Sequence, residues 1–443
     1  MASTLKRKEA PSTGRSSSKK AKIEVPEYHL TTSLRDENDN IIWPAPKVQI
    51  QNARKTIRES AQPNNRILIV PDKDADGLTS GCILRRTLIL LGASADNIAV
   101  HLISKGNTIH TDVERDKMAS HNPSYVFVLD QGSRSGPPVI DSPHTALIID
   151  HHHAEDGSFP NGAQFVTACH SPPVATASLL TYTLCAELHP VVKEQCAWLC
   201  IIGTHGDLGT TIKWLPPFPD MTDTFKRYSK KALNDCVSAL NAPRRTATYD
   251  VISAWNALVD ATKPEDVLQV KRLHLARDEV FAETERCTHT PPKFSYDGKV
   301  AVLRISSGAQ VHPVIATRWA GHLNSKKLEV VLVANSGYLP GYVNFSCRIP
   351  RCARSRDPPV NLIESLKSFA DLAEDPTLRE RLGDAFARGH KEASGGIVPV
   401  EEFEELMRAL RVGEKPEKQE SPKKAKEKSP QKNTLANYFS KKD

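Results

Sequence analysis

The sequence predicts an α/β protein with two domains, and two observations support this prediction. Short apolar runs of strand length alternate with helical segments over residues 44–215 and again over 291–412. This alternation is typical of a largely parallel sheet covered by helices. The chain has 443 residues, 39% hydrophobic and 25% charged, which is enough for two soluble cores. No apolar run approaches the roughly 20 residues that cross a bilayer, so no membrane contact is expected.

The first domain, 44–215, should contain four strands with helices between them. A helix whose apolar stripe begins at Leu78 should end at Gly92, and a second helix is expected at Asp112–Ser120. Two further helices should lie within about 174–202. The expected strands are Ile67–Val70, Ile98–Ile103, Tyr125–Leu129 and Ala146–Ile149.

Acidic clusters follow three of these strands, and a fourth follows the apolar run Trp198–Ile202. In parallel sheets the functional site lies beyond the carboxyl ends of the strands. Carboxylates and imidazoles gathered there suit hard divalent cations, with Mn²⁺ preferred and Mg²⁺ possible. The fourth acid lies in a glycine-rich turn, where an aspartate alone is usually a turn former. The clusters are Asp72, Asp74 and Asp76 before Gly77; Asp130; Asp150-His151-His152; and Asp207.

Together, these clusters resemble the DHH phosphoesterase superfamily, whose motifs occur in the same order. The resemblance covers about residues 66–210 and implies a centre of two divalent cations that hydrolyses phosphoesters without a covalent nucleophile. It implies that Asp150 bridges or orients and that His152 faces the scissile phosphate. It assigns the metal ligands to Asp72, Asp74, Asp76, Asp130, His151 and Asp207.

A helical connector, 216–290, should lead to a smaller α/β domain at 291–412. Strands are expected at Val300–Ile305, Leu328–Ala334 and Tyr342–Cys347, with helices near Pro313–Leu323, Leu362–Leu372 and Val400–Arg411. The loop Pro350–Pro359 carries three arginines and is either a grip on a nucleic-acid backbone or an ordinary exposed turn.

Several motifs of this second domain resemble the C-terminal substrate domain of RecJ-type nucleases. They are His312-Pro313, a Ser-x-Arg element and a glycine-rich loop at Arg388–Gly396. The resemblance implies single-stranded DNA or RNA as the bound partner, because other branches carry a different C-terminal domain. Substrate binding is expected from Ser346, Arg348, Arg388, Gly389 and His390.

Both ends of the chain are basic and poor in large apolar residues, which predicts disordered tails. Of the net charge of +7, residues 1–23 carry +6 and 413–443 carry +4, which leaves the body at −3. The two lysine-rich clusters within 1–24 resemble a bipartite nuclear import signal, which implies an import receptor and the nucleus; the alternative is a generic basic tail. Nine scattered cysteines without a Cys-x-x-Cys pair fit a reducing compartment.

The tail at 413–443 ends in a segment that resembles the PCNA sliding-clamp box. Three apolar side chains spaced i, i+3 and i+4 would form a plug on one helical turn. Lysine stands where the box has glutamine, and Gln431 lies one residue early. Another short-motif partner or a chance match are the alternatives. The box residues are Lys432, Leu435, Tyr438 and Phe439.

We therefore expect a nuclear, metal-dependent hydrolase: a DHH exonuclease or phosphodiesterase of single-stranded nucleic acid, active in DNA replication or repair. A catalytically silent replication scaffold, like the helicase-cofactor relative of RecJ, is one alternative. A phosphodiesterase of short oligonucleotides is the other. The sequence does not specify polarity of digestion, DNA or RNA preference, processivity or oligomeric state.

Overall fold

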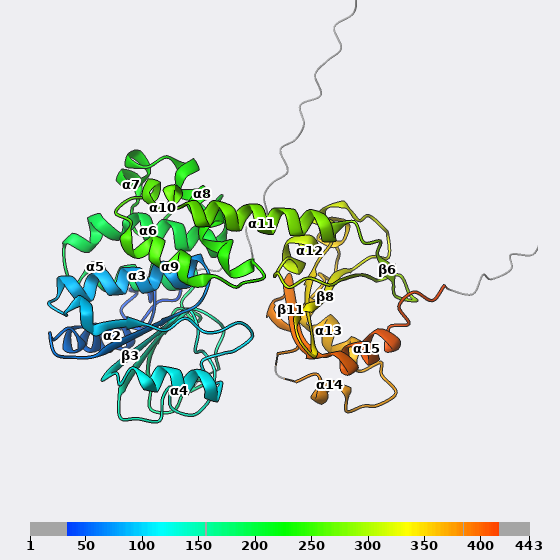
Figure 1. Ribbon diagram of the computed structural model, residues 1–443, viewed down its shortest axis with the longest axis horizontal. Helices are drawn as coiled ribbons and strands as arrows, with labels where there is room; N and C mark the ends of the chain where they lie inside the picture. Colours follow the sequence, from blue (N-terminus) through cyan, green and yellow to red (C-terminus); the bar gives the residue numbers. More distant parts are fainter. Residues whose placement is uncertain (1–32, 156, 384, 416–443) are drawn as a thin grey trace, which may run out of the picture. The chain divides into compact units, whose positions relative to one another are not determined.

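The computed structural model describes residues 33–155, 157–383 and 385–415, and it divides into two compact units (Figure 1). The first unit ends at Glu283 and the second begins at Thr284. The predicted import signal within 1–24 and the clamp-box residues lie outside the described residues. Among the described residues, no helix has both the length and the apolar character that a membrane span requires.

The first unit contains a five-stranded parallel sheet of order β2-β1-β3-β4-β5. This arrangement confirms the predicted α/β class. The second strand is shorter than expected, and β5 was not predicted. The strands are β1 (Ile67–Pro71), β2 (Ile98–Val100), β3 (Tyr125–Leu129), β4 (Thr145–Asp150) and β5 (Gln164–Thr167).

Both faces of this sheet are buried, which explains why its strands read as unbroken apolar runs. Ile67 and Ile69 belong to the larger core with the helices α2, α3, α5 and α6. Leu68 and Val70 face a smaller core that includes Met118 of α4. The helices are α2 (Lys47–Ser60), which was not predicted, α3 (Ala75–Leu90), α4 (Asp112–Ser120), α5 (Ala177–Ala186) and α6 (Val191–Leu208).

The segment expected to be a helical connector consists of helices with short turns between them. The boundary between the two units falls inside the last of these helices. The helices are α7 (Thr222–Arg227), α8 (Lys230–Asn241), α9 (Val251–Asp260), α10 (Pro264–Gln269) and α11 (Lys271–Thr288).

The second unit is built on a mixed six-stranded sheet of order β10-β11-β9-β8-β7-β6. One face packs against α13 and α15, and α12 covers β8 and β9. The strands are β6 (Lys293–Phe294), β7 (Val300–Ile305), β8 (Val330–Leu339), β9 (Tyr342–Arg348), β10 (Arg388–His390) and β11 (Ala393–Pro399). The helices are α12 (His312–His322), α13 (Leu362–Ala370), α14 (Leu378–Arg381) and α15 (Val400–Ala409).

The prediction of a glycine-rich loop at Arg388–Gly396 was wrong, because these residues form the β10–β11 hairpin. Its glycines are required by close strand packing. A Cβ atom on Gly395 would lie 2.3 Å from the Phe345 carbonyl oxygen of β9, and Gly389 has a φ of +109°. Close strand pairing therefore explains the glycine-rich composition of this segment, which is more usual for loops.

Candidate metal centre

Three strands of the first unit end next to one another at the carboxyl edge of the sheet. Asp72 follows β1 at once and Asp130 follows β3, while Asp150 is the last residue of β4. The parallel register pairs Pro71 with Leu129 and Leu129 with Ile149, so these acids converge. The sheet thus brings together side chains that lie far apart in the sequence.

The turn between β1 and α3 is closed by Asp74, the N-cap of α3. Its Oδ1 accepts hydrogen bonds from the backbone N–H groups of Asp76 and Gly77 at 3.1 and 3.2 Å. Only glycine fits at position 77, because a Cβ atom there would lie 2.6 Å from the Asp72 carbonyl oxygen. Burial raises the pKa of Asp74, but the charge of Arg244 and the Gly77 N–H outweigh it and lower the pKa overall.

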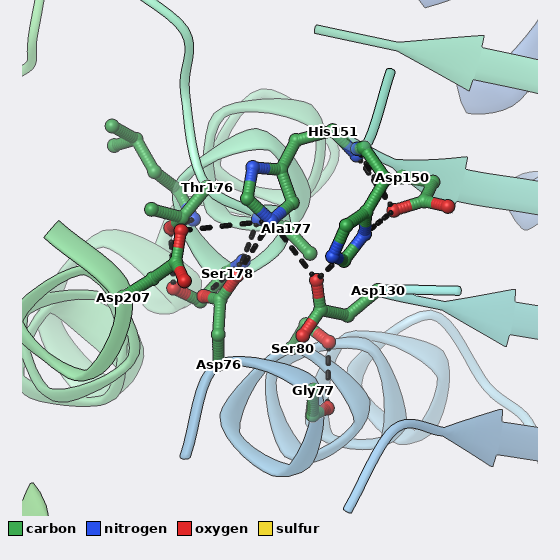
Figure 2. A network of polar contacts seen from close by, with 12 residues as sticks. Asp76, Gly77, Ser80, Asp130, Asp150, His151, Thr176, Ala177, Ser178 and Asp207 are labelled. Atoms are coloured by element: carbon green, nitrogen blue, oxygen red, sulfur yellow. Dashed lines mark hydrogen bonds and ion pairs between the residues drawn. The ribbon is translucent and has the colours of Figure 1, made fainter. Parts of the chain in front are cut away.

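Asp76 lies on the first turn of α3 and is bound by a second helix. The backbone N–H groups of Ala177 and Ser178 donate to Asp76 Oδ2 and Oδ1 at 2.7 and 2.9 Å (Figure 2). These groups are the otherwise unpaired donors at the N-terminus of α5. Burial nevertheless raises the pKa of Asp76 to about 6, with the charge of Asp207 adding to it.

Asp130 occupies a strained position, with a φ of +62°, which residues other than glycine rarely adopt. Its Oδ1 is buried and has no hydrogen-bond partner among the described residues, although His151 Nε2 lies 3.2 Å away as an ion-pair contact. Burial, followed by the charges of Asp76 and Asp74, raises the pKa of Asp130 well above its usual range. Strain and an unsatisfied buried oxygen are features of functional sites.

His151 lies at the centre of the cluster, as Figure 2 shows. Its Nε2 faces carboxylate oxygens of Asp130, Asp207 and Asp76 at 3.2, 3.7 and 3.9 Å. Burial lowers the pKa of His151, but the charges of Asp207 and Asp76 outweigh it and raise the pKa overall. In this arrangement the imidazole lies at the position where a positive charge would interact favourably with all three carboxylates.

Asp150 orients the histidines and does not face the centre of the cluster. Its Oδ1 accepts from the His151 and His152 backbone N–H groups and contacts His152 Nδ1 at 2.8 Å. Its Oδ2 accepts from the Ser133 N–H at 3.1 Å. Burial raises the pKa of Asp150, but the His152 hydrogen bond and charge lower it strongly overall. The orienting role predicted for Asp150 matches these contacts better than the bridging role.

Asp207 lies in a helix, so the prediction of a glycine-rich turn around it was wrong. It is in the last turn of α6, which ends at Leu208 before Gly209 with a φ of +84°. Gly203 and Gly206 allow close helix packing: a Cβ atom on Gly203 would lie 2.2 Å from Ser178 Oγ, and one on Gly206 would lie 3.0 Å from the Ala75 Cβ. The glycines thus bring α6 close to α3 and α5.

The donor set fits divalent cations. Two groups of side chains each place one ligand atom per residue within 4.8 Å of one another: Asp72, Asp74 and Asp130, and Asp130, His151 and His152. Asp130 belongs to both groups, and its Oδ1 is the unsatisfied oxygen. Asp76 and Asp207 contact His151 at the same place. Oxygen and imidazole donors with excess negative charge are suited to Mn²⁺ or Mg²⁺.

Several residues that the motifs do not assign to the site border this cluster. Arg244 Nη2 lies 3.9 Å from Asp74 Oδ2, and Lys73 Nζ lies 3.3 Å from Asp72 Oδ1. Asn241 Oδ1 accepts from the Ala75 N–H and from Arg244 Nε at 3.3 and 3.1 Å. Lys73 lies inside the first acidic motif, whereas the sequence signal for Arg244 is only the basic pair Arg244-Arg245 in the connector.

In the second unit, the residues predicted to bind substrate lie on two strands, β9 and β10, which are the two neighbours of β11. Ser346 of β9 is paired with Gly395 of β11, which is paired in turn with Arg388 of β10. Arg348 Nη1 donates to Ser346 Oγ at 2.9 Å, and burial lowers the pKa of Arg348. Gly389 and His390 complete the edge strand β10. The sheet therefore places all five positions within its three strands nearest the β10 edge.

Part of the arginine-rich loop Pro350–Pro359 has a structural role. The Arg356 guanidinium donates to Glu329 Oε1 and to the carbonyl oxygens of Lys326 and Leu328. Arg351 and Arg354 are exposed. The loop is therefore fixed by one arginine and presents the other two to solvent.

Comparisons with known proteins agree with this geometry. Residues 66–204 match the DHH family, N-terminal domain. Among solved structures, RecJ from Thermus thermophilus in complex with Mn²⁺ has a TM-score of 0.58 and 18% identity, over 84% of this chain and 55% of RecJ. This chain thus spans about half the length of that RecJ.

Two further solved structures are also similar. An exonuclease RecJ bound to manganese has a TM-score of 0.55 and 18% identity, covering 84% of this chain and 95% of its own. The DHH domain of a member of a ribosomal protein family has a TM-score of 0.58 and 15% identity, covering 82% of this chain and 90% of its own. No curated protein matches the sequence. Residues 66–204 therefore form a DHH family N-terminal domain, in a chain that has the fold of RecJ.

Proposed function

We propose that this protein is a metal-dependent phosphodiesterase that hydrolyses single-stranded nucleic acid with two divalent cations. The observation that carries the proposal is the convergence around His151, where Asp130, Asp207 and Asp76 lie within 3.9 Å of one imidazole nitrogen. Repulsion between buried carboxylates disfavours such a cluster unless cations neutralise it. The DHH family match and the similarity to Mn²⁺-bound and Mg²⁺-bound RecJ support it.

Six side chains would hold the cations: Asp72, Asp74, Asp76, Asp130, His151 and Asp207. Bound cations would acidify a water molecule and neutralise charge on the phosphoryl oxygens. The chain itself contributes rigid placement of the donors. Asp74 is held as the N-cap of α3, and Asp76 is held by two N–H groups of α5. Fixed donors need little reorganisation when the substrate arrives.

His152 would act on the substrate directly. Its side chain is 53% exposed, and its Nδ1 lies 2.8 Å from Asp150 Oδ1, so Nε2 remains available to solvent. Burial lowers the pKa of His152, but the hydrogen bond and charge of Asp150 raise it to about 9. A protonated imidazole at neutral pH would donate to a phosphate oxygen and stabilise its charge.

The second unit would supply the grip on the nucleic-acid strand. Ser346 and Arg348 lie on β9 and Arg388 lies on β10, with β11 between the two strands, and a guanidinium binds a phosphate with two parallel hydrogen bonds. The body of the chain has a net charge of −3, which disfavours a broad duplex-binding face. A single nucleic-acid strand contacted by a few arginine side chains is consistent with that charge.

The decisive experiment is product analysis with 5′- and 3′-labelled single-stranded DNA and RNA, comparing Mn²⁺ with Mg²⁺. We expect metal-dependent release of short products, lost with EDTA and with Asp130→Asn. No hydrolysis by the full chain, or equal hydrolysis by the variant, would overturn the proposal. A competition assay separates the two substrate classes. If dinucleotides inhibit the hydrolysis of long strands strongly, the protein is a phosphodiesterase of short oligonucleotides.

A catalytically silent replication scaffold is the alternative from another class. Every predicted ligand position carries a ligating side chain, and the structure brings these side chains together. A scaffold needs no such cluster. Calorimetric titration with Mn²⁺ separates the two functions, because a scaffold is expected to show no tight binding at two sites.

The proposed setting is the nucleus, at sites of DNA replication or repair, through contacts with an import receptor and PCNA. Its support is the sequence of the two tails. Replacing three lysines of the first tail by alanine in a fluorescent fusion of the full chain should keep the fusion protein in the cytoplasm. These lysines are Lys19, Lys20 and Lys22. A peptide spanning 429–443 should bind PCNA, and Tyr438→Ala with Phe439→Ala should remove that binding.

A further inference from the structure

A buried histidine that no motif predicts lies two residues before Asp207. His205 is 2% exposed, its Nδ1 lies 3.0 Å from Asn234 Oδ1, and its Nε2 lies 3.3 Å from Trp214 Nε1. An indole N–H only donates, so His205 Nε2 accepts and Nδ1 carries the proton donated to Asn234. One tautomer of the neutral imidazole satisfies both contacts.

These two contacts attach the end of α6 to two other segments. Asn234 belongs to α8, and Trp214 belongs to the loop that follows α6. Aromatic rings surround the histidine: Phe225 stacks on it with centroids 6.2 Å apart, and Trp214 packs edge-on against Phe225 and Phe218. The imidazole is therefore fixed in position and in orientation.

The opposite side of the same helical turn packs against the metal centre. A Cβ atom on Gly206 would lie 3.0 Å from the Cβ of Ala75, the residue between Asp74 and Asp76. Asp207 follows, with a side chain that is 35% exposed and Oδ2 at 3.7 Å from His151 Nε2. Among the described residues, this ion pair is the contact that the structure gives to the Asp207 carboxylate. Its placement therefore depends on the backbone of α6.

We propose that His205 is a positioning residue of the metal centre, which holds the end of α6 so that the Asp207 carboxylate faces His151. This inference rests on the proposed function, because it assumes that Asp207 is a ligand. Side chains that hydrogen-bond directly to metal ligands usually change metal affinity about 10- to 100-fold when they are replaced, and His205 acts through the α6 backbone, so we expect an effect at the lower end of this range.

Three variants of the full chain test this role, with Mn²⁺ binding measured by calorimetry and single-strand hydrolysis measured separately. His205→Phe keeps a ring beside Phe225 but removes both hydrogen bonds, and we expect about tenfold weaker Mn²⁺ binding and a lower kcat with unchanged KM. Trp214→Phe removes one donor and should have a smaller effect in the same direction. His205→Gln can donate and accept, and should restore most of the affinity.

The matched control is Tyr182→Phe, which removes a hydrogen bond of 3.3 Å to the Lys193 carbonyl oxygen near the other end of α6. It should lower the free energy of unfolding without changing Mn²⁺ affinity. Wild-type affinity in both His205→Phe and Trp214→Phe, or an equal loss in the control, would overturn the positioning role alone. If His205→Phe does not fold, Trp214→Phe decides. A wild-type chain that binds no Mn²⁺ overturns the metal centre itself.

Discussion

The Ser178 backbone N–H donates a hydrogen bond of 2.9 Å to Asp76 Oδ1, which joins the start of α5 to the first turn of α3. Ala177 donates to the other oxygen of the same carboxylate. Asp76 also lies 3.9 Å from His151, so one side chain links two helices and belongs to the candidate metal centre. Replacing it should therefore affect folding and metal binding together.

Asp76→Asn and Asp130→Asn should separate these two effects. The amide of Asp76→Asn places N–H donors opposite the N–H groups of α5, and a buried donor left unpaired costs about 1–3 kcal/mol. Asp130 Oδ1 accepts no hydrogen bond from the described residues, so Asp130→Asn should leave the metal-free protein at least as stable as wild type. Both variants should lose Mn²⁺ binding. Urea unfolding in EDTA and calorimetry measure the two quantities, and equal stability of the variants would contradict this prediction.

The stability of the metal-free protein should depend on pH through the same carboxylates. The pKa of Asp76 is raised by burial from 3.8 to about 6, so the folded chain binds this proton more tightly than the unfolded chain. The stabilisation is complete below about pH 4 and is lost as pH rises through 6, by about 3 kcal/mol. Excess Mn²⁺ should reverse this loss.

Unfolding by urea at about pH 4.5 and about pH 7, in EDTA and in Mn²⁺, measures this effect. Asp130→Asn serves as the comparison, because it removes a second carboxyl whose pKa burial raises, and it should therefore reduce the pH dependence. No loss of stability of the wild type in EDTA between the two pH values, or a loss of the same size in the variant, would contradict the raised pKa values of these carboxyls.

Asp150→Asn should impair catalysis more than metal binding. The carboxylate fixes His152 through a contact of 2.8 Å and also accepts hydrogen bonds from three backbone N–H groups, so its loss releases the imidazole. We expect hydrolysis to fall about 10- to 100-fold while Mn²⁺ affinity changes less. Asp116→Asn, on the exposed face of α4, is the matched control. Loss of metal binding equal to that of Asp130→Asn would assign Asp150 to the ligands instead.

The main strands and the acids at their ends could be predicted from the sequence because both are local signals. Runs such as Tyr125–Leu129 are apolar throughout, and acids directly follow them. The sequence predicts a turn around Asp207, because Gly203 and Gly206 are typical of turns. Their actual role, close packing against Ser178 and Ala75, depends on segments distant in the sequence. Composition alone does not distinguish these two uses of glycine.

Sequence patterns also do not predict the contacts between the connector and the first acidic motif, Asp72–Gly77. Asn241 binds the Ala75 N–H across 166 residues, and no spacing rule relates them. The same limit applies to His205 and its partner Asn234. Such residues are identified only once α8 has been placed against α3 and α6.

Arg348→Lys should weaken binding of single strands without changing the metal centre. The guanidinium already donates to Ser346 Oγ at 2.9 Å and to the Cys347 carbonyl oxygen at 2.8 Å, so its orientation is fixed. Lysine offers one point charge in place of two parallel donors, and we expect the Kd for a labelled strand to rise about tenfold. Arg304→Lys, in an exposed pair with Glu404 of the same unit, is the control and should leave the Kd unchanged. A Kd that rises equally in both variants would indicate a general charge effect, whereas no change in Arg348→Lys would remove this residue from the substrate site.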